Sequence, residues 1–221
     1  MSASYLAYIQ EEIMEKYVFF DIDGTLNRTD LYAVEAYQKA LLKRGIHTNR
    51  EKIISCFGLK PNTIAEIFLG KPGEEELISW KRDIEEYEFY FMEKNARPFD
   101  GITEMLSALK CAGFGLAICS NAFPKHINHV LSVLGLAQYF REIGSLDMGT
   151  NKGEIIKKIM VRTSSRKACM VGDRKFDLQA AEANHIPIIG CAYGYAPDEI
   201  KNASIVVNSP GEIVKAVNEL L

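Results

Sequence analysis

The sequence predicts a three-layer α/β fold in which a parallel sheet is covered by helices and carries an inserted helical segment. Apolar runs of strand length recur along the 221 residues, and helical patterns separate most of them. A stretch of about seventy residues after the first run has helix-like periodicity and no convincing strand. Because alternating strands and helices build parallel sheets covered on both faces, we expect one such core with a helical insertion.

The predicted strands are short apolar runs, the last of which is the weakest: residues 17–20, 114–119, 167–171, 186–192 and 204–207. Two helices carry clear end signals. Asp100 is placed to cap a helix over residues 102–110, and Ser209 and Pro210 precede an amphipathic helix at the end of the chain. The first sixteen residues contain three glutamates and no basic leader, which favours a short packing helix over a signal peptide.

The insertion is predicted to span residues 28–95, between a core made of residues 1–27 and 96–221. Its helical patterns cover residues 31–45, 62–70 and 76–94. The polar segment 27–30 and the turn 97–101 bound it and are candidate hinges.

Composition argues against several classes of partner. The formal charge is −3, with no basic run interleaved with aromatics, which argues against a nucleic-acid partner. The apolar runs fall short of the roughly 20 residues that cross a bilayer, so no membrane partner is expected. The five cysteines form no CxxC pair, which favours buried free thiols and a cytoplasmic location. Strand alternation would point Cys119 away from its neighbour Ser120.

Chemically active side chains follow several of the predicted strands. These residues are Asp21 and Asp23 in YVFFDIDGT, Ser120 and Asn121 in GLAICSN, Lys152 in TNKGE, and Asp173 and Asp177 in CMVGDRKFD. The carboxyl ends of parallel strands form one crevice, so these motifs are expected to make one site. Carboxylates beside a hydroxyl and a lysine are typical of phosphoryl transfer assisted by a divalent cation.

The DxDGT segment has alternative interpretations as an acidic turn or a calcium-binding loop. A calcium loop would require a further Asp or Asn in place of Thr25 and a glycine in place of Leu26. It would also follow a helix rather than an apolar strand. The sequence therefore favours a catalytic carboxylate at Asp21.

These motifs, in this order, resemble the four signature motifs of the haloacid dehalogenase (HAD) superfamily, and the resemblance covers nearly all of the chain after the N-terminal segment. It implies a Rossmann-like core, a C1-type helical cap and a bound Mg²⁺. It further implies that Asp21 is the nucleophile and Asp23 the general acid and base. The metal ligands would be Asp21, Asp173 and the backbone carbonyl of Asp23, and the phosphate would bind Ser120, Asn121 and Lys152.

Some positions leave alternatives open. Asp177 could hold metal-bound water, position Lys152, or cap a helix. Lys152 lies outside the KPxP-like context in which the phosphate-binding lysine of the family often occurs. Lys157 or Lys158 is therefore an alternative for that role. Arg28 stands where many relatives carry an acid and is a candidate contact for a substrate carboxylate or phosphate.

The segment FGLKPNT (57–63) resembles the cap loop of phosphoglycolate phosphatases, which makes Lys60 and Asn62 candidates for substrate specificity; an ordinary solvated loop is the alternative. YGYAPDEI (193–200) resembles a glycine-containing loop of the same relatives. The expected function is a Mg²⁺-dependent phosphatase that hydrolyses a small phosphorylated metabolite, a phosphomonoester similar to phosphoglycolate or a sugar phosphate, through an aspartyl-phosphate intermediate. A β-phosphoglucomutase-like enzyme and a non-catalytic phosphate-binding protein are the alternatives. Neither the oligomeric state nor the pathway follows from the sequence.

Overall fold

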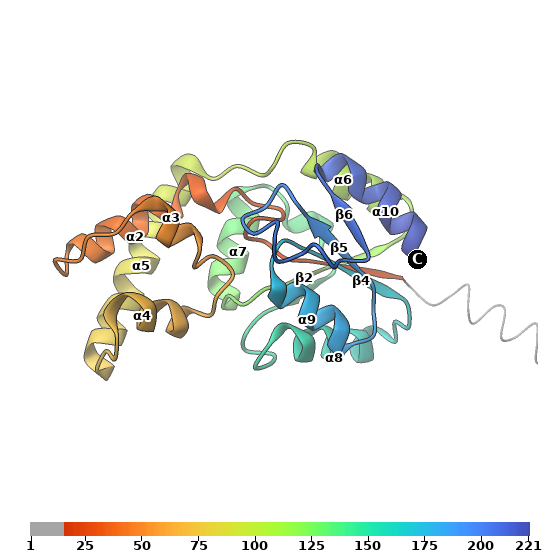
Figure 1. Cartoon of the computed structure of the whole chain (residues 1–221). Coiled ribbons are helices and arrows are strands. Elements are labelled where there is room, and N and C mark those ends of the chain that lie inside the picture. Colours follow the sequence, from red (N-terminus) through yellow and green to blue (C-terminus); the bar gives the residue numbers. More distant parts are fainter. Residues whose placement is uncertain (1–15) are drawn as a thin grey trace, which may run out of the picture.

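The structure, a computed structural model, describes residues 16–221. Six parallel strands form one sheet in the order β3-β2-β1-β4-β5-β6 (Figure 1). The strands are β1 Tyr17–Phe20, β2 Gly115–Cys119, β3 Glu142–Gly144, β4 Ala168–Gly172, β5 Ile188–Cys191 and β6 Ile205–Val207. The predicted α/β fold with a parallel sheet is confirmed. The helix expected in the first sixteen residues lies outside the described residues.

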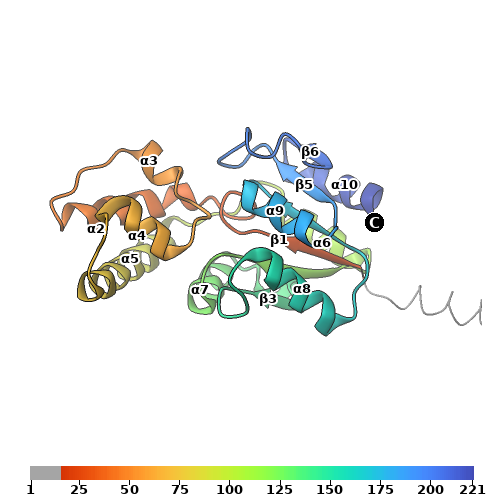
Figure 2. The ribbon, with the colours of Figure 1, turned by 60° about the horizontal axis from the view of Figure 1, so that its bottom comes forward.

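Helices cover both faces of the sheet because every residue of the central strand β1 is apolar. Val18 and Phe20 pack into a core cluster with α6, α7 and α10, whereas Tyr17 and Phe19 pack into a second cluster with α8 and α9. This alternation is the period of two that a strand imposes. The two helix layers lie on opposite sides of the sheet (Figure 2). Their bounds are α6 Ile102–Cys111, α7 Pro124–Val133, α8 Lys152–Thr163, α9 Lys175–Ala183 and α10 Ile213–Leu220.

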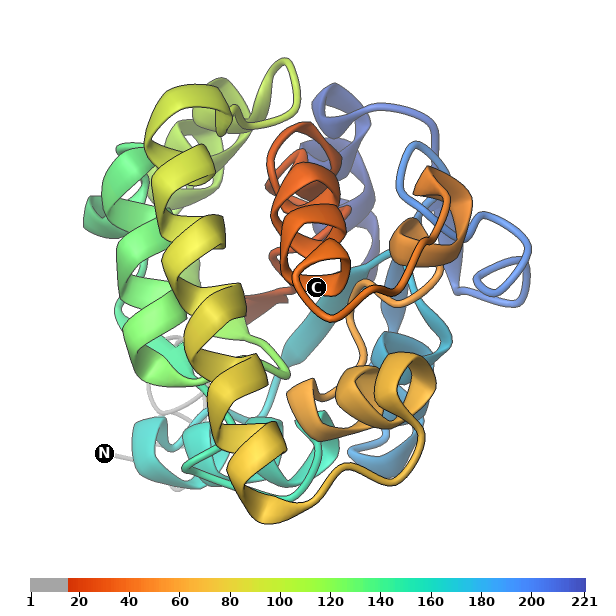
Figure 3. The ribbon, with the colours of Figure 1, turned by 90° about the vertical axis from the view of Figure 1, so that its left-hand side faces the viewer.

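The segment between β1 and β2 is helical, as the sequence predicts, and its long helices α2 and α5 pack along each other (Figure 3). Trp80 of α5 contacts Tyr37 of α2 edge to face, with ring centroids 5.9 Å apart. The buried carboxylate of Asp83 pairs with Lys43 and Arg44, each at 2.8 Å. The elements are η1 Thr29–Leu31, α2 Ala33–Leu42, α3 Arg50–Ile54, α4 Pro61–Leu69 and α5 Glu74–Asn95.

The two connections between this helical segment and the sheet run beside each other. The backbone N–H of Arg28 donates to the carbonyl of Arg97 at 3.0 Å, and that of Phe99 donates to Leu26 at 3.1 Å. Asn27 and Pro98 form an antiparallel bridge between them. Because both expected hinges lie in this paired neck, we propose that the segment 28–95 is a cap that moves about it.

Several local predictions have definite outcomes. The cap of α6 was predicted wrongly: the N-cap residue is Gly101, in a left-handed conformation with φ 87°, and the Asp100 side chain makes no cap hydrogen bond. Strand β3, only three residues long, was not predicted. His185 has a φ of 55°, in the left-handed region that residues other than glycine seldom adopt. Among residues 16–221, none of the helices has the length and apolar character needed to span a bilayer.

Candidate active site

The candidate site lies at the carboxyl ends of three adjacent strands. Asp21 follows β1, Ser120 follows β2, and Asp173 follows β4. Strand β1 pairs with both β2 and β4, so the parallel sheet brings residues separated by up to about 150 positions to one edge. The predicted convergence of these motifs is therefore observed in the structure.

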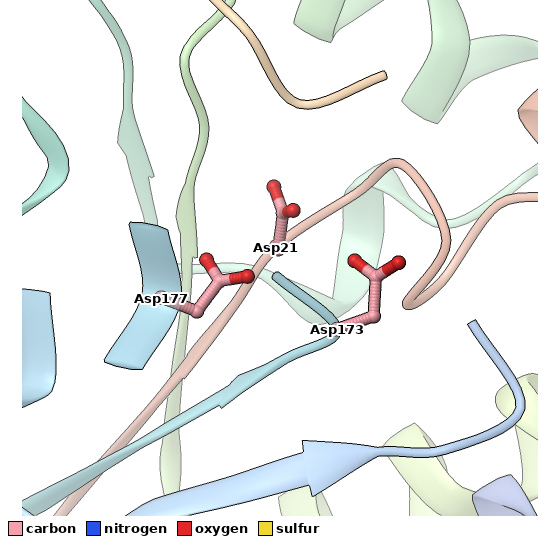
Figure 4. Close-up of side chains that lie close together, drawn as sticks. All are labelled: Asp21, Asp173 and Asp177. Atoms are coloured by element: carbon pink, nitrogen blue, oxygen red, sulfur yellow. The ribbon is translucent and has the colours of Figure 1, made fainter. Parts of the chain in front are cut away.

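Three buried aspartates converge at this edge, as Figure 4 shows. Carboxylate oxygens of Asp21, Asp173 and Asp177 all lie within 4.8 Å of one another. Burial raises the pKa of Asp173 well above its usual range, and the charges of Asp21 and Asp177 raise it further. A cation among these groups would relieve that repulsion.

Two oxygens of this cluster have no partner within the protein. Oδ2 of Asp21 and Oδ1 of Asp173 are buried without a hydrogen bond, whereas Oδ2 of Asp173 accepts from the backbone N–H of Tyr195 at 2.7 Å. Unpaired buried carboxylate oxygens are costly, and oxygen is the ligand that Mg²⁺ prefers. The donor set therefore fits Mg²⁺ bound by Asp21 and Asp173.

Asp177 has both of its oxygens engaged. Oδ1 accepts from Lys152 Nζ at 2.6 Å, and Oδ2 accepts from the backbone N–H of Arg174 at 3.0 Å. It thus positions Lys152 and also caps α9, two of the alternatives that the sequence left open. Since neither oxygen is free, Asp177 is better suited to supporting the site than to binding a metal directly.

Lys152 lies between two aspartates at the start of α8. Its ammonium is 2.7 Å from Oδ1 of Asp21 and 2.6 Å from Oδ1 of Asp177, and its side chain is 2% exposed. Burial alone would lower the pKa of Lys152, but the charges of Asp177 and Asp21 outweigh burial and raise it. The side chain is therefore a fixed positive charge. Lys157 and Lys158 are exposed, and Lys158 donates to the carbonyl of Met148 away from the aspartates.

Asp23 lies at the rim of the site, partly exposed. Its Oδ1 accepts from the hydroxyl of Thr29 at 2.5 Å, and Thr29 itself is buried next to the neck. Burial raises the pKa of Asp23, as does the charge of Asp21, while His126 and the Thr29 hydrogen bond oppose the shift. Asp21 and Asp23 thus have the different environments that a nucleophile and a proton carrier require.

Ser120 and Asn121 lie beside the aspartates but are already engaged in hydrogen bonds. The Ser120 hydroxyl accepts from the backbone N–H of Ala122 at 3.2 Å. Nδ2 of Asn121 donates to the carbonyl of Gly58 at 2.9 Å, while its Oδ1 is buried without a partner. Asn121 therefore links the core to the helical insertion, a contact that the sequence did not predict.

Glycines allow the backbone to approach Asp173 closely. A Cβ at Gly194 would lie 2.3 Å from Cβ of Asp173 and 2.6 Å from the carbonyl oxygen of Gly24. Gly24 has a φ of 82° and would place a Cβ 2.3 Å from Oδ2 of Asp173. The backbone of the loop after β5 therefore packs directly against Asp173, the candidate metal ligand. This close approach agrees with the resemblance of YGYAPDEI to a glycine-containing loop of phosphoglycolate phosphatases.

We expect Gly194→Ala to displace Asp173, because the added methyl has no space between backbone and carboxylate. Activity should fall by at least about tenfold, and the free energy of unfolding should fall by about 1–3 kcal/mol. Gly73→Ala is the matched control, since a Cβ there meets nothing within 4 Å. Steady-state kinetics and urea unfolding of both variants measure this. Equal behaviour of the two variants would contradict the tight packing.

A cavity of about 240 Å³ lies over Asp21 and Asp23. Ser120 and Asn121 also line its core side. Its walls are mostly apolar and come largely from the insertion: Tyr37, Phe57, Leu59, Pro61, Ile64, Trp80, Ile84 and, from the core, Phe123. Such a cavity is suited to one small molecule.

Two polar residues in this cavity, Glu88 of α5 and His126 of α7, are not among the site residues predicted from the sequence. Glu88 is 9% exposed, and its Oε2 lies 3.7 Å from Nδ1 of His126. The sequence does indicate that Glu88 is buried, because Glu88 follows Trp80 and Ile84 at a spacing of four residues and so lies on the same buried helix face. His129, three residues after His126 on α7, stacks on Phe89 with ring centroids 4.1 Å apart.

The three candidate specificity residues are not among the residues that line this cavity. Arg28 is exposed and lies 3.6 Å from the carboxylate of Asp30. Lys60 donates to the carbonyl of Thr150 across the boundary between insertion and core, and Asn62 is exposed. Their roles in specificity remain predictions that this arrangement does not support.

The loop 55–60 of the insertion is held against the core. Arg174 donates to the carbonyls of Phe57 and Ser55 and pairs with Glu199 at 3.0 Å. The ring of Phe57 packs edge to face on Tyr195, with centroids 5.2 Å apart. These contacts hold Phe57, which lines the cavity, against the core.

Comparison with known proteins decides the family. The sequence profile described as haloacid dehalogenase-like hydrolase matches residues 18–191, which contain every predicted motif from Asp21 to Asp177. The chain belongs to this family. The expected membership of the HAD superfamily, and with it the expectation of an enzyme of the hydrolase type, is confirmed.

Relatives of this HAD-like hydrolase include proteins with different names. Tyrosine-protein kinase PtkA of Mycobacterium tuberculosis is 26% identical over 89% of this chain and 69% of its own length. Phosphoglycolate phosphatase of Shigella dysenteriae is 27% identical over 92% of this chain and 90% of that enzyme. The crystal structure of a predicted phosphatase from Clostridium acetobutylicum is 28% identical, with a TM-score of 0.81, and covers 94% of this chain and all of that chain.

Proposed function

We propose that the protein is a Mg²⁺-dependent phosphatase that hydrolyses a small phosphomonoester through an aspartyl-phosphate on Asp21. The observation that carries this proposal is the convergence of Asp21, Asp173 and Lys152 beside a cavity that Asp21 lines, with one unpaired buried oxygen on Asp21 and one on Asp173. The phosphatase names of relatives that align along most of the chain support the same reaction.

Asp21 acts as the nucleophile in the proposed reaction. Its carboxylate forms a bond to phosphorus while the bond from phosphorus to the alcohol oxygen breaks. Asp23 gives its proton to the leaving alcohol and then, as a carboxylate, takes a proton from the water that cleaves the acyl phosphate. The products are inorganic phosphate, the free alcohol and regenerated Asp21.

The remaining residues of the site stabilise the charge of the phosphoryl group and orient the reacting side chains. Lys152 places a positive charge beside the Asp21 carboxylate, and the Ser120 hydroxyl and Asn121 amide lie where they could donate to phosphoryl oxygens. Thr29 holds Asp23 in position at the rim. A Mg²⁺ ion held by Asp21, Asp173 and the carbonyl of Asp23 would supply positive charge for the transferring phosphoryl group.

Phosphate release from a panel of phosphorylated metabolites tests the function directly. Release with Mg²⁺ and without added bisphosphate would support hydrolysis, whereas turnover that requires a sugar bisphosphate would support the mutase alternative. No release or covalent labelling with any member of the panel would favour a phosphate-binding protein without turnover. All five cysteines are free thiols, which supports the proposed cytoplasmic location; four are buried as expected, whereas Cys111 is exposed.

Removal of the metal should have two measurable effects. We expect a chelator to lower phosphate release by at least about a hundredfold, because the developing negative charge loses its counterion. Mg²⁺ at about 100 times its dissociation constant should also add about 2.7 kcal/mol to the free energy of unfolding. Asp173→Asn should lose that added stability, while Asp100→Asn, at an exposed position, should keep it. Full activity in chelator together with no stabilisation by Mg²⁺ would refute the metal site.

A further inference from the structure

The part of the cavity beyond the aspartates has a distinct chemical character. Three aromatic side chains, those of Tyr37, Phe57 and Trp80, line it together with several aliphatic ones. The neighbouring polar groups are Glu88 and His126, which lie on facing helices with Oε2 and Nδ1 3.7 Å apart. A bound alcohol group would thus contact apolar walls and the Glu88–His126 pair.

The surroundings of Glu88 and His126 shift both pKa values toward the uncharged forms of these side chains. Burial raises the pKa of Glu88 to about 8, and the charges of Asp23 and Glu85 contribute. Burial also lowers the pKa of His126, with Asp23 opposing this shift. A protonated carboxyl and a neutral imidazole can each donate and accept a hydrogen bond, and a hydroxyl group is their natural partner.

Positive charge is scarce in this part of the cavity. Among the residues that line it, the lysines are Lys81 and Lys125, both exposed, and Lys125 pairs with Glu85. A substrate carboxylate placed here would lose its hydration without gaining a buried cation, and it would face Asp23. Burying an unpaired charge is among the most costly changes in a protein.

We propose that the alcohol released by this enzyme is uncharged, with an apolar body that packs against Trp80 and Phe57 and a hydroxyl that binds Glu88 and His126. Small carboxylated esters such as phosphoglycolate are then poor substrates, although relatives carry that name. The proposal rests on the proposed phosphatase function and names the substrate class of the same site.

Three matched substrates test the proposal: benzyl phosphate, 3-(hydroxymethyl)benzyl phosphate and 3-carboxybenzyl phosphate. They share one ring and one reacting phosphate and differ in a single substituent. We expect kcat/KM to be about tenfold higher for the hydroxymethyl ester than for benzyl phosphate, because one buried hydrogen bond is added. The carboxylated ester should be lower than benzyl phosphate by about a hundredfold.

Variants at Glu88 connect this preference to the polar pair. Glu88→Leu should remove the advantage of the hydroxymethyl ester while benzyl phosphate is still hydrolysed, and Glu88→Gln, which keeps a donor and an acceptor, should retain most of it. Glu86→Leu, at an exposed position two residues away on the same helix, is the control and should change neither ratio.

The outcomes separate this inference from the proposed function. A wild-type preference for the carboxylated ester or for phosphoglycolate would overturn the substrate class and leave the phosphatase intact. The same conclusion follows if none of the benzyl esters reacts while other phosphomonoesters do, or if Glu88→Leu keeps the hydroxymethyl preference. No hydrolysis of any phosphomonoester would instead contradict the phosphatase itself. If Glu88→Leu does not fold, the order of kcat/KM for the three benzyl esters with the wild-type enzyme still tests the proposed substrate class.

Discussion

Asp21→Asn is expected to lower phosphate release by at least about a thousandfold and to abolish covalent phosphate on the protein. The amide is a poor nucleophile, and no other carboxylate in the described structure combines contact with Lys152 and a free buried oxygen. Rapid quenching with labelled substrate, followed by mass spectrometry of the peptide that contains residue 21, measures the adduct. Phosphate trapped on this peptide of the wild type should be sensitive to hydroxylamine.

The same substitution should leave the folded state intact. Lys152 keeps its contact with Asp177 at 2.6 Å, and loss of the Asp21 charge removes one of the repulsions that raise the pKa of Asp173. The urea midpoint should therefore stay within the range of the control Asp100→Asn, at an exposed surface position. Retention of full activity by Asp21→Asn, with a folded protein, would show that the nucleophile has been assigned wrongly.

Lys152→Met should affect both stability and catalysis. Removal of the ammonium leaves Asp21 and Asp177 as buried carboxylates without their partner, and such a loss typically costs about 3–5 kcal/mol. Because methionine preserves much of the side-chain volume, the loss in free energy of unfolding measures the effect of the missing charge and not that of a cavity. Urea unfolding in the presence of chelator measures it, because bound metal would compensate part of the lost charge. Phosphate release should fall by at least about a hundredfold.

Two further variants test whether the effect of Lys152→Met comes from the loss of its buried charge. Lys158→Met removes an exposed lysine from the same helix and should change stability by less than about 0.5 kcal/mol. Adding Asp177→Asn to Lys152→Met should restore part of the lost stability, since one uncompensated charge is then neutral. If the two single lysine variants are equally stable, the buried ion pair does not stabilise the protein as inferred.

The sequence predicted which residues gather at the carboxyl ends of the strands, because the pattern that indicates them is local. Asp21, Ser120 and Asp173 each come directly after the last residue of a strand, as Asp21 follows Phe20. Parallel strands then bring those ends together whatever the length of the intervening chain. The same locality explains the failure at Asp100: a polar residue before a helix has the composition of a cap, but the backbone turns at Gly101 instead. Strand β3 was missed because three residues are too few to show a period.

The sequence alone determines a parallel α/β core with a helical insertion. It also determines the cluster of aspartates beside Lys152. Only the tertiary structure decided what faces the substrate beyond the phosphate. The tilt and rotation of α5 against α7 bring Glu88 to His126, whereas Lys60 and Asn62 lie outside the cavity. The spacing of Glu88 with Trp80 and Ile84 indicates a buried position, but the residue that Glu88 faces depends on how helices distant in sequence pack against each other.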